Sequence, residues 1–252
     1  FHVIRFDNRD IGLSNEFSHV PPPTRGQLAK GVIAGRPITS AYVLSDMAAD
    51  AMGLLDELGV ESAHVMGMSM GGMIAQQVAI DHPKRVRSLV SVMSTTGQRG
   101  VGRPSAKVAR MALRRPAGEV DPADMIRHSV EFFREVSGER FNEADVRAQA
   151  NASFERSFRP DGTARQLAAI IASGDRTDAL RRLALPTLVV HGLADTLVGP
   201  SGGGATAKAI QGSRLLMFND MGHDLPDTRR AEIAAAVRLT ANLASPQTVG
   251  AA

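Results

Sequence analysis

The residues that most constrain this chain are 63–81, where a short apolar run, a Gly-x-Ser-x-Gly pentapeptide and an apolar-periodic segment follow one another. The run 63–66 predicts a strand and 70–81 predicts a helix, so the pentapeptide between them predicts a sharp strand-to-helix turn. Such a turn leaves the hydroxyl of its serine exposed at the end of the strand. We therefore predict that Ser69 is a nucleophile.

The residues that flank Ser69 fit the same interpretation. Gly67 and Gly71 are expected because the turn brings backbone too close for a Cβ atom. The N–H of Met70, in the first turn of the predicted helix, points to where negative charge develops on an attacked carbonyl, and the helix dipole favours that charge. Met70 is therefore the candidate oxyanion donor. Met68, with its flexible thioether beside the nucleophile, is a candidate substrate contact.

A second match shows that the spacing alone is a weak signal. The segment Gly199-Pro200-Ser201-Gly202-Gly203 has the same pattern, but it lies several residues beyond the preceding apolar run and within a proline- and glycine-rich stretch. That context is typical of a loop. We interpret Ser201 as an ordinary loop serine.

A serine nucleophile needs a base, and the base needs a carboxylate that fixes its tautomer. Of the seven histidines, His223 follows a strand-like run at 215–218 and precedes a long helical segment. Asp195 follows the continuous apolar run 186–192, whereas no acid follows the run 88–93. Because the carboxyl ends of parallel strands meet at one edge of a sheet, Ser69, Asp195 and His223 are predicted to meet there as a catalytic triad.

Strand-like and helical segments alternate along most of the chain. Runs at 3–6, 63–66, 88–93, 186–192 and 215–218 predict strands, and periodic segments at 41–58 and 70–81 predict helices, which together favour an α/β fold with a parallel sheet. Between about 98 and 182 the strand pattern stops and charged helical segments replace it. We predict core sheet with the nucleophile turn at 1–97, a helical lid at 98–182, core sheet with acid and histidine at 183–243, and a tail at 244–252.

Four segments carry a resemblance to a known family: 3–14, the turn around Ser69, 82–90, and the paired segments that hold Asp195 and Gly222-His223. The chain resembles the α/β-hydrolase superfamily, specifically its single-domain lipase and esterase members that include the aclacinomycin methylesterases. The segment 3–14 is similar to the family's Asp-x-Arg-Gly-x-Gly-x-Ser loop, with Asp10 where many members have glycine. We expect that departure to alter only the loop, and we expect structural hydrogen bonds from Asp7 and Arg9.

The resemblance implies a mostly parallel sheet flanked by helices, with an inserted helical lid. In that family the run 3–6 is the fourth strand, so the resemblance implies that three strands and a helix precede it and that one of them carries the loop with the second oxyanion N–H. We therefore expect the N-terminal strands to be missing here, and the run 3–6 to face a gap in the sheet. The 252 residues alone are expected to fold poorly and to be nearly inactive, whereas a chain extended by roughly 40–50 N-terminal residues is expected to be active.

Composition excludes several classes of function. At 252 residues and 43% hydrophobic, the chain is long enough for one sizeable domain. The absence of cysteine excludes disulfides, a thiol nucleophile and thiolate metal sites, and fits a cytoplasmic location. No Trp and a single Tyr leave few stacking residues, so we reject nucleic-acid binding. The sequence contains no run of 18 apolar residues, so it predicts no membrane-spanning helix.

The sequence leaves two interpretations of its basic charge open. Residues 99–182 contain sixteen Lys and Arg against twelve Asp and Glu. This excess predicts peripheral contact with anionic lipid or with phosphate-bearing acyl carriers; the alternative is a set of solvated helix faces with local ion pairs.

We predict a serine hydrolase that cleaves carboxylic esters of apolar groups through an acyl-enzyme, without metal or cofactor. Thioesters and phospholipids remain open as substrates. Two alternatives use the same fold: a cofactor-free perhydrolase of the haloperoxidase type, and a catalytically silent ligand-binding protein.

Overall fold

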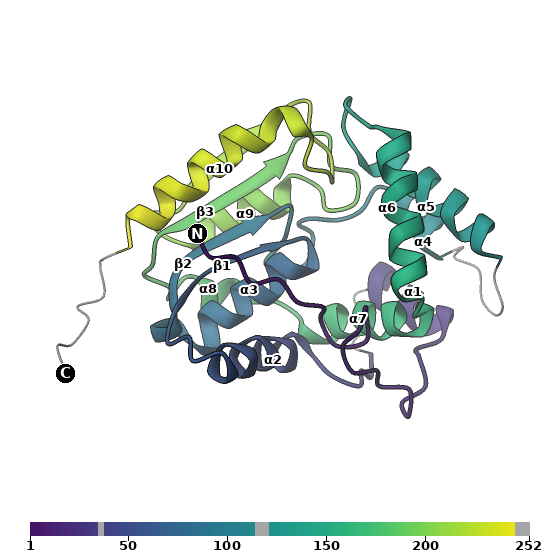
Figure 1. The fold of residues 1–252 in the computed structure, drawn as a ribbon, viewed down its shortest axis with the longest axis horizontal. Coiled ribbons are helices and arrows are strands. Elements are labelled where there is room, and N and C mark those ends of the chain that lie inside the picture. The colour runs from purple at the N-terminus through teal and green to yellow at the C-terminus, as the bar shows by residue number, and fades with distance from the viewer. Residues whose placement is uncertain (35–37, 114–120, 245–252) are drawn as a thin grey trace.

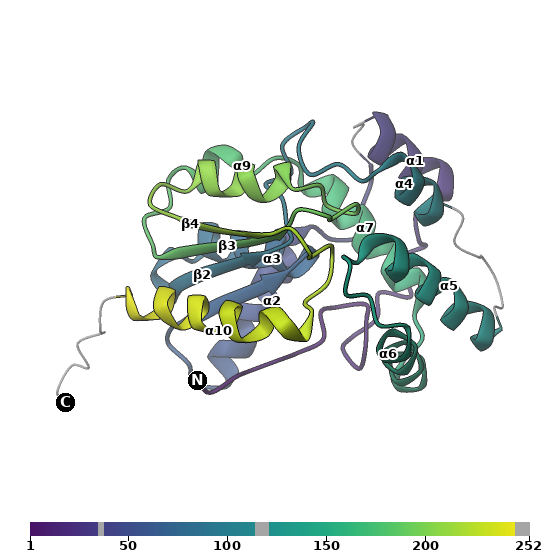
Figure 2. The ribbon, with the colours of Figure 1, turned by 90° about the horizontal axis from the view of Figure 1, so that it is seen from above.

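The computed structural model describes residues 1–34, 38–113 and 121–244. Within these ranges the sheet has four parallel strands whose order in space equals their order in the chain. The strands are β1 (Ala63–Met68), β2 (Val86–Val92), β3 (Thr187–Gly192) and β4 (Arg214–Phe218). Parallel strands need a crossover between them, and α3 (Met70–Asp81) and α9 (Ser201–Ala209) supply the first and the last. The predicted α/β fold with a parallel sheet is therefore observed (Figures 1 and 2).

Helices cover both faces of the sheet, which explains why β2 and β3 are almost continuously buried. One core cluster packs α2 (Leu44–Glu57) and α3 against the sheet and includes Leu89 of β2. The other includes the next residue, Val90, and Ile233 of α10 (Asp227–Asn242). Because successive side chains of a strand point to opposite faces, the two clusters lie on opposite faces of the sheet.

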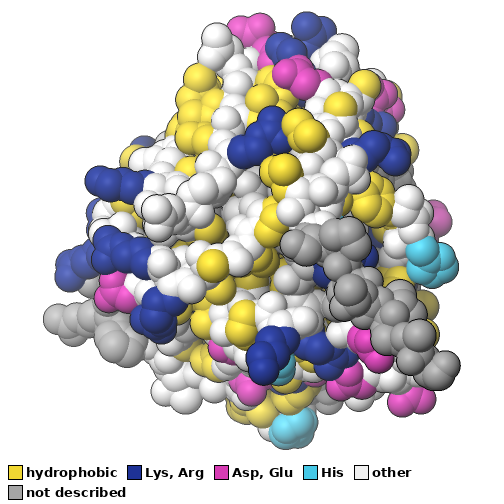
Figure 3. Space-filling model, turned by 90° about the vertical axis from the view of Figure 1, so that its left-hand side faces the viewer, with side chains coloured by type: hydrophobic (Ala, Val, Ile, Leu, Met, Phe, Trp, Pro, Cys, Tyr) yellow, Lys and Arg dark blue, Asp and Glu magenta, His cyan; other side chains and the backbone are white. Residues whose placement is uncertain are grey.

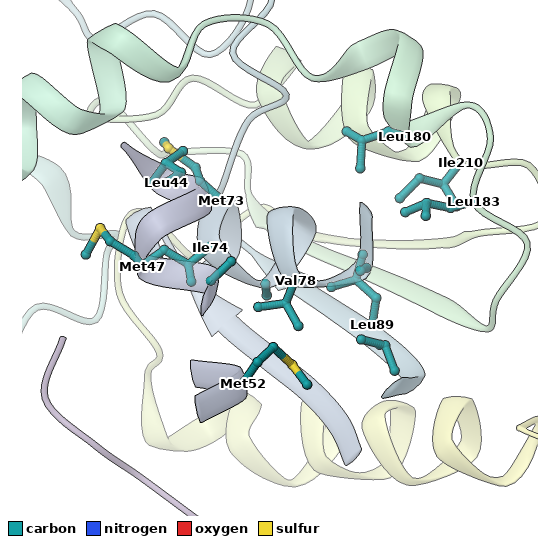
Figure 4. Close-up of a cluster of buried hydrophobic side chains, with 14 of the residues drawn as sticks. Leu44, Met47, Met52, Met73, Ile74, Val78, Leu89, Leu180, Leu183 and Ile210 are labelled. Carbon is teal, nitrogen blue, oxygen red and sulfur yellow. The ribbon is translucent and has the colours of Figure 1, made fainter. Parts of the chain in front are cut away.

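The first cluster is built on helical spacing. Leu44, Met47 and Ala48 of α2 are fully buried in this cluster. In Figure 4, Met73 of α3 lies beside Leu44 and Ile74 of α3 lies beside Met47. Burying side chains of this size stabilises a fold by about 1.5–3 kcal/mol each. α2 begins three residues later than predicted, because the Asp46 carboxylate accepts a hydrogen bond from the N–H of Val43 at 2.8 Å and so marks the first turn.

Between β2 and β3 the described residues form helices and no strand. These are α4 (Ala106–Leu113), α5 (Pro122–Val136), α6 (Glu143–Arg156), α7 (Pro160–Ser173) and α8 (Thr177–Leu180). We call this segment, residues 98–182, the helical insertion. Its helices α4, α5 and α6 stand to one side of the sheet (Figure 1), whereas α8 returns to it and packs on α3 and α9. α1 (Arg25–Ala34), which the sequence analysis did not predict, packs on α7.

The predicted strand at 3–6 is wrong. Residues 1–8 form no helix or strand, and the side chains of Phe1, Val3 and Phe6 are exposed. The ring of Phe1 meets the edge of the His64 imidazole at 5.8 Å between centroids, but no described strand pairs with this segment. An apolar run becomes a strand only where a neighbour completes its backbone hydrogen bonds. Most of the predicted tail, 245–252, lies outside the described residues.

Asp10 does more than alter its loop. Its φ of 73° lies in the region that favours glycine, which fits the glycine of the family pattern. The buried Asp10 carboxylate accepts hydrogen bonds from both Nε and Nη2 of Arg165 in α7, each at 2.9 Å, and from the Tyr42 hydroxyl at 2.6 Å. Burial opposes ionisation of this carboxyl, but the bonds from Arg165 and Tyr42 outweigh it and hold its pKa below the ordinary aspartate value. Asp10 therefore fastens its loop to the insertion.

Two expected structural hydrogen bonds are confirmed nearby. Asp7 accepts a bidentate pair from Arg156 of α6, at 3.0 and 2.6 Å. Arg9 donates to both carboxylate oxygens of Asp50 in α2, at 2.6 and 2.7 Å. The loop at 7–17 is thus fixed to the insertion on one side and to the core helices on the other.

Candidate active site

Ser69 occupies the strained turn that the sequence predicts. It follows β1 directly, precedes α3, and has φ 55° and ψ −120°, a conformation rare outside glycine. Its N–H donates to the carbonyl of Val92 at 2.8 Å and its carbonyl accepts from Met73 at 3.2 Å, so the strand on one side and the helix on the other hold this strain in place. Strain of this kind is found at functional sites whose surroundings over-determine the backbone.

The two glycines of the motif serve different purposes. A Cβ on Gly67 would lie 1.9 Å from the carbonyl oxygen of Gly71, so no other residue fits there. A Cβ on Gly71 would meet nothing within 4 Å. The close approach instead falls on Gly72, where a Cβ would lie 2.7 Å from Cβ of Ser94. Crowding explains Gly67, but the expectation that it also explains Gly71 is wrong.

Asp195 and His223 are brought together as a buried pair. Nδ1 of His223 lies 2.7 Å from Oδ2 of Asp195, and each residue is 4% exposed. The other carboxylate oxygen, Oδ1, accepts hydrogen bonds from the N–H groups of Leu197 at 2.9 Å and Val198 at 2.8 Å. An acceptor on Nδ1 fixes the tautomer in which Nε2 can act as a base.

The end of α5 holds the loop that carries His223. The N–H of His223 donates to the carbonyl of Val136, the last residue of α5, at 2.7 Å. Asp224 accepts from the N–H groups of Gly222 at 2.8 Å and Gly138 at 3.1 Å. The hydroxyl of Thr196, beside Asp195, donates to the carbonyl of Glu135 at 2.9 Å. The acid loop and the histidine loop are both tied to one helix end of the insertion.

Ser69 lies at the same edge of the sheet as the pair, since the carboxyl ends of β1, β3 and β4 point the same way. Among the hydrogen bonds of the described residues, none joins the Ser69 hydroxyl to His223. Nucleophile-to-base bonds are often long without substrate and tighten when it binds. Of the flanking residues, Met68 is 39% exposed and Met70 begins α3, whose first N–H groups have no partner within the helix.

Ser201 has a structural position. It is the first residue of α9, and its hydroxyl accepts a hydrogen bond from the N–H of Gly102 at 3.0 Å. The glycines that follow it let α9 approach closely, since a Cβ on Gly202 would lie 2.9 Å from the carbonyl oxygen of Ser94. Packing of α9 against the start of the insertion accounts for this second serine motif.

A cavity of about 310 Å³ lies within the insertion, between α5, α6 and the start of α7, next to Ile11 and Gly12. Three phenylalanines line it, one from α5, one from α6 and one from the turn after α6: Phe133, Phe154 and Phe158. The residues that line it include no carboxylate, and Arg159 is the one cation. Phe133 is one helical turn before Val136, so α5 connects the cavity to the His223 loop.

Two buried polar residues, one of them beside the pair, were not recognised from the sequence. His191 of β3 is fully buried, and its Nε2 lies 3.5 Å from Oδ2 of Asp195. Arg176 is 5% exposed and donates to the carbonyl of Thr95 at 2.9 Å, and burial lowers its pKa to about 10. A histidine within an otherwise apolar strand was the available signal for His191; no local pattern distinguishes Arg176 from the other arginines.

Comparison with known proteins places this geometry in a family. The profile of the alpha/beta hydrolase fold matches residues 1–229. Rhodomycin D methylesterase DauP of Streptomyces sp. (strain C5) is 26% identical over 261 positions, covering 93% of this chain and 79% of that protein. The 2-hydroxymuconate semialdehyde hydrolase of Pseudomonas putida is 29% identical over 191 positions, covering 75% of this chain and 65% of that protein.

A solved structure agrees with the sequence relatives. The crystal structure of a hydrolase from Pseudomonas aeruginosa PA01 shares 26% identity with this chain and has a TM-score of 0.66, covering 95% of this chain and 79% of that one. The predicted α/β-hydrolase fold is thereby confirmed. With this profile match, these relatives and this sheet, the chain belongs to the α/β-hydrolase family and is a hydrolase.

Proposed function

We propose that this hydrolase cleaves carboxylic esters through an acyl-enzyme formed on Ser69. The observation that carries the proposal is the buried Asp195–His223 pair, 2.7 Å apart, at the same sheet edge as a serine with φ 55°. Chain order supports it as well, because serine, acid and histidine follow one another as in the fold's known triads.

In the proposed reaction His223 takes the proton of the Ser69 hydroxyl as the oxygen attacks the ester carbonyl. Asp195 holds the imidazole by its Nδ1–H and stabilises the imidazolium that forms. The N–H of Met70 donates to the oxyanion, helped by the positive end of the α3 dipole. His223 then protonates the leaving alcohol, and a water that it activates releases the acyl group from Ser69.

The surroundings favour apolar substrates. The exposed thioether of Met68 lies next to Ser69 in sequence and offers an adaptable apolar contact. The cavity beside α5, about 310 Å³ and lined by phenylalanines, is in the size range of small-molecule sites. We propose that it accepts the apolar part of the ester that extends away from the scissile bond.

The chain offers its own control for a test of the nucleophile, because two serines stand in Gly-x-Ser-x-Gly patterns. Ser69→Ala should lower kcat for a p-nitrophenyl ester by several orders of magnitude and abolish fluorophosphonate labelling. Ser201→Ala should label and turn over like the wild type. Retention of more than about a tenth of the activity in Ser69→Ala would exclude it as nucleophile, and peroxide-dependent turnover of acetate in place of ester cleavage would favour the perhydrolase alternative.

A further inference from the structure

His191 is the second histidine beside Asp195. It lies in β3, is fully buried, and its Nε2 is 2.8 Å from the carbonyl oxygen of Val198. Since a carbonyl oxygen only accepts, Nε2 must carry the proton and donate it. The other ring nitrogen, Nδ1, is buried and has no hydrogen-bond partner among the described residues. The contacts therefore place a proton on Nε2, and they favour the neutral imidazole because a second N–H, on Nδ1, would be buried without an acceptor.

Both backbone polar groups of Val198, its N–H and its carbonyl, form hydrogen bonds to side chains. Its N–H donates to Oδ1 of Asp195 at 2.8 Å, and its carbonyl accepts from His191 at 2.8 Å. The turn from Asp195 to Val198 is thus closed by the carboxylate and fastened to β3 by the imidazole. With Oδ1 committed to this turn, Oδ2 is left to face Nδ1 of His223 at 2.7 Å.

The neighbouring helix leaves the imidazole no room to move. A Cβ on Gly203 of α9 would lie 2.5 Å from Nδ1 of His191 and 2.9 Å from its Cγ. Glycine at 203 is what allows α9 to close over the ring. The fixed position matters because a donor holds a turn only if the donor itself cannot rotate away.

The electrostatic surroundings agree with a neutral ring. Burial lowers the pKa of His191, the contacts with Val198 and Asp195 oppose this effect, and the nearby His223 adds to it. Asp195 and His223 are the charged or titratable groups that act on the ring; Gly203 of α9 and Met217, its partner in β4, carry no charge. A neutral His191 does not compete with His223 for the charge of Asp195.

We propose that His191 is a positioning residue of the reaction: its Nε2–H fixes the turn from Asp195 to Val198, and thereby the carboxylate oxygen that orients His223. The proposal rests on the triad of the proposed function. His191 touches no reacting atom, and it acts through the direction in which Oδ2 points.

The test compares two substitutions that differ in one hydrogen-bond donor. His191→Leu fills similar space without a donor, whereas His191→Gln returns an N–H near the position of Nε2. His191→Leu should lower kcat by about 10–100-fold, the loss found when a residue that orients a metal ligand from behind is removed, with KM little changed. It should also move the pH dependence of kcat/KM to lower pH, because a displaced carboxylate stabilises the imidazolium of His223 less. His191→Gln should recover most of both effects.

His64 supplies the matched control, since it is a partly buried histidine on β1 whose Nδ1 lies 2.8 Å from the Ser88 hydroxyl. His64→Leu should leave kcat and the pH dependence unchanged. Equal losses in His191→Leu and His191→Gln, or wild-type kinetics in His191→Leu, would reduce His191 to a packing role.

Proton and nitrogen NMR of the histidine rings provides a readout that does not depend on turnover or on the folding of a variant. In the wild type His191 should stay neutral with its proton on Nε2 from about pH 5 to 8, the range over which an ordinary histidine titrates. A downfield proton resonance should report the His223–Asp195 bond, and His191→Leu should weaken or shift it. A charged His191, or a proton on its Nδ1, would overturn the proposal. If Ser69→Ala retained activity, the triad would fail while these resonances stayed as expected, so the two failures are distinguishable.

Discussion

Asp195 combines two tasks at the scale of a single residue, because one carboxylate oxygen closes its own turn and the other faces His223. Asp195→Asn keeps the turn's acceptor but places an amide opposite Nδ1, where it favours the wrong imidazole tautomer. We expect kcat to fall by on the order of 10⁴-fold, a smaller loss than for His223→Ala, measured with one ester at one pH. An equal loss in both variants would argue against a purely orienting role.

Gly67 and Gly71 allow the crowding of the turn to be tested residue by residue. Gly67→Ala forces a Cβ to within 1.9 Å of backbone, so it should lower the free energy of unfolding by several kcal/mol or prevent folding. Gly71→Ala meets open space in a helix and should be neutral or stabilising by up to about 1 kcal/mol. Thermal unfolding of both variants measures the difference, and similar midpoints would contradict it.

The sequence could predict that Ser69, Asp195 and His223 lie at one edge of the sheet, because each follows a recognisable strand and their order matches a known pattern. His191 and the Asp10–Arg165 pair could not be predicted in the same way. Arg165 is 155 positions from Asp10, and only the packed chain shows which of many arginines meets which acid. Local patterns predict where the chain turns, whereas side-chain partners depend on contacts between distant segments.

At the scale of elements, the buried ion pair between Asp10 and Arg165 joins the loop at 7–17 to α7. Its contribution to the free energy of unfolding can be tested by substitution. Asp10→Asn removes the charge partner that Arg165, 2% exposed, contacts at 2.9 Å and leaves it only the longer contact with Glu16 at 3.5 Å. We expect the free energy of unfolding to fall by about 3–5 kcal/mol at neutral pH. Asp7→Asn, which removes a more exposed pair with Arg156, is the matched control and should cost much less.

The pH dependence of this difference follows from the direction of the pKa shift. The pKa of Asp10 lies below its ordinary value in the folded state, so its contribution is complete above the unfolded value of about 3.9 and is lost as pH falls through the folded value. The stability gap between wild type and Asp10→Asn should therefore shrink only below about pH 4. A gap that is constant down to pH 2, measured by denaturant unfolding, would show that the charge of Asp10 is not responsible.

The accuracy of the sequence-based prediction also differs from one helix or strand to another. The helix at 70–81 was predicted to the residue because a motif marks its start, and β1 to β4 were located within two residues at their ends. The run at 3–6 has the composition of a strand but no described partner, and α1 has too little periodicity to be recognised. Elements with a marked end or a buried face were predictable; those that depend on a distant partner were not.

At the scale of the whole molecule, ion pairs engage much of the basic charge of the insertion. Nine of its cations contact an acid: Lys107, Arg127, Arg134, Arg140, Arg147, Arg156, Arg159, Arg165 and Arg181. On the face turned away from the insertion, basic side chains lie in several separate places with hydrophobic ones between them (Figure 3). In the described residues no helix has the length and hydropathy that a membrane span requires.

Peripheral contact with anionic lipid stays a prediction. The ion pairs show which cations to substitute in a test of it. Arg99 and Arg103 are exposed and form no ion pair among the described residues, so they are the cations to test. Hydrolysis of an ester in anionic vesicles should fall as salt shortens the Debye length below about 8 Å, and Arg99→Gln with Arg103→Gln should remove that dependence. Arg127→Gln, which removes a paired cation, should not. Equal salt dependence for a soluble ester would contradict lipid contact and would leave the basic residues as a solvated surface.

The last turn of α5 has a consequence for how such a hydrolase can be redesigned. Its carbonyl groups at Glu135 and Val136 receive the acid loop and the histidine loop, while the residues one to three turns earlier line the cavity. An insertion grafted from a relative would have to keep the backbone of residues 135–138, which bonds the acid and histidine loops, whatever residues line its cavity. We call residues 135–138 the joint. Chimeras that exchange the cavity-lining helices on both sides of the joint, and keep its four residues, should exchange substrate range and keep their catalytic loops in register.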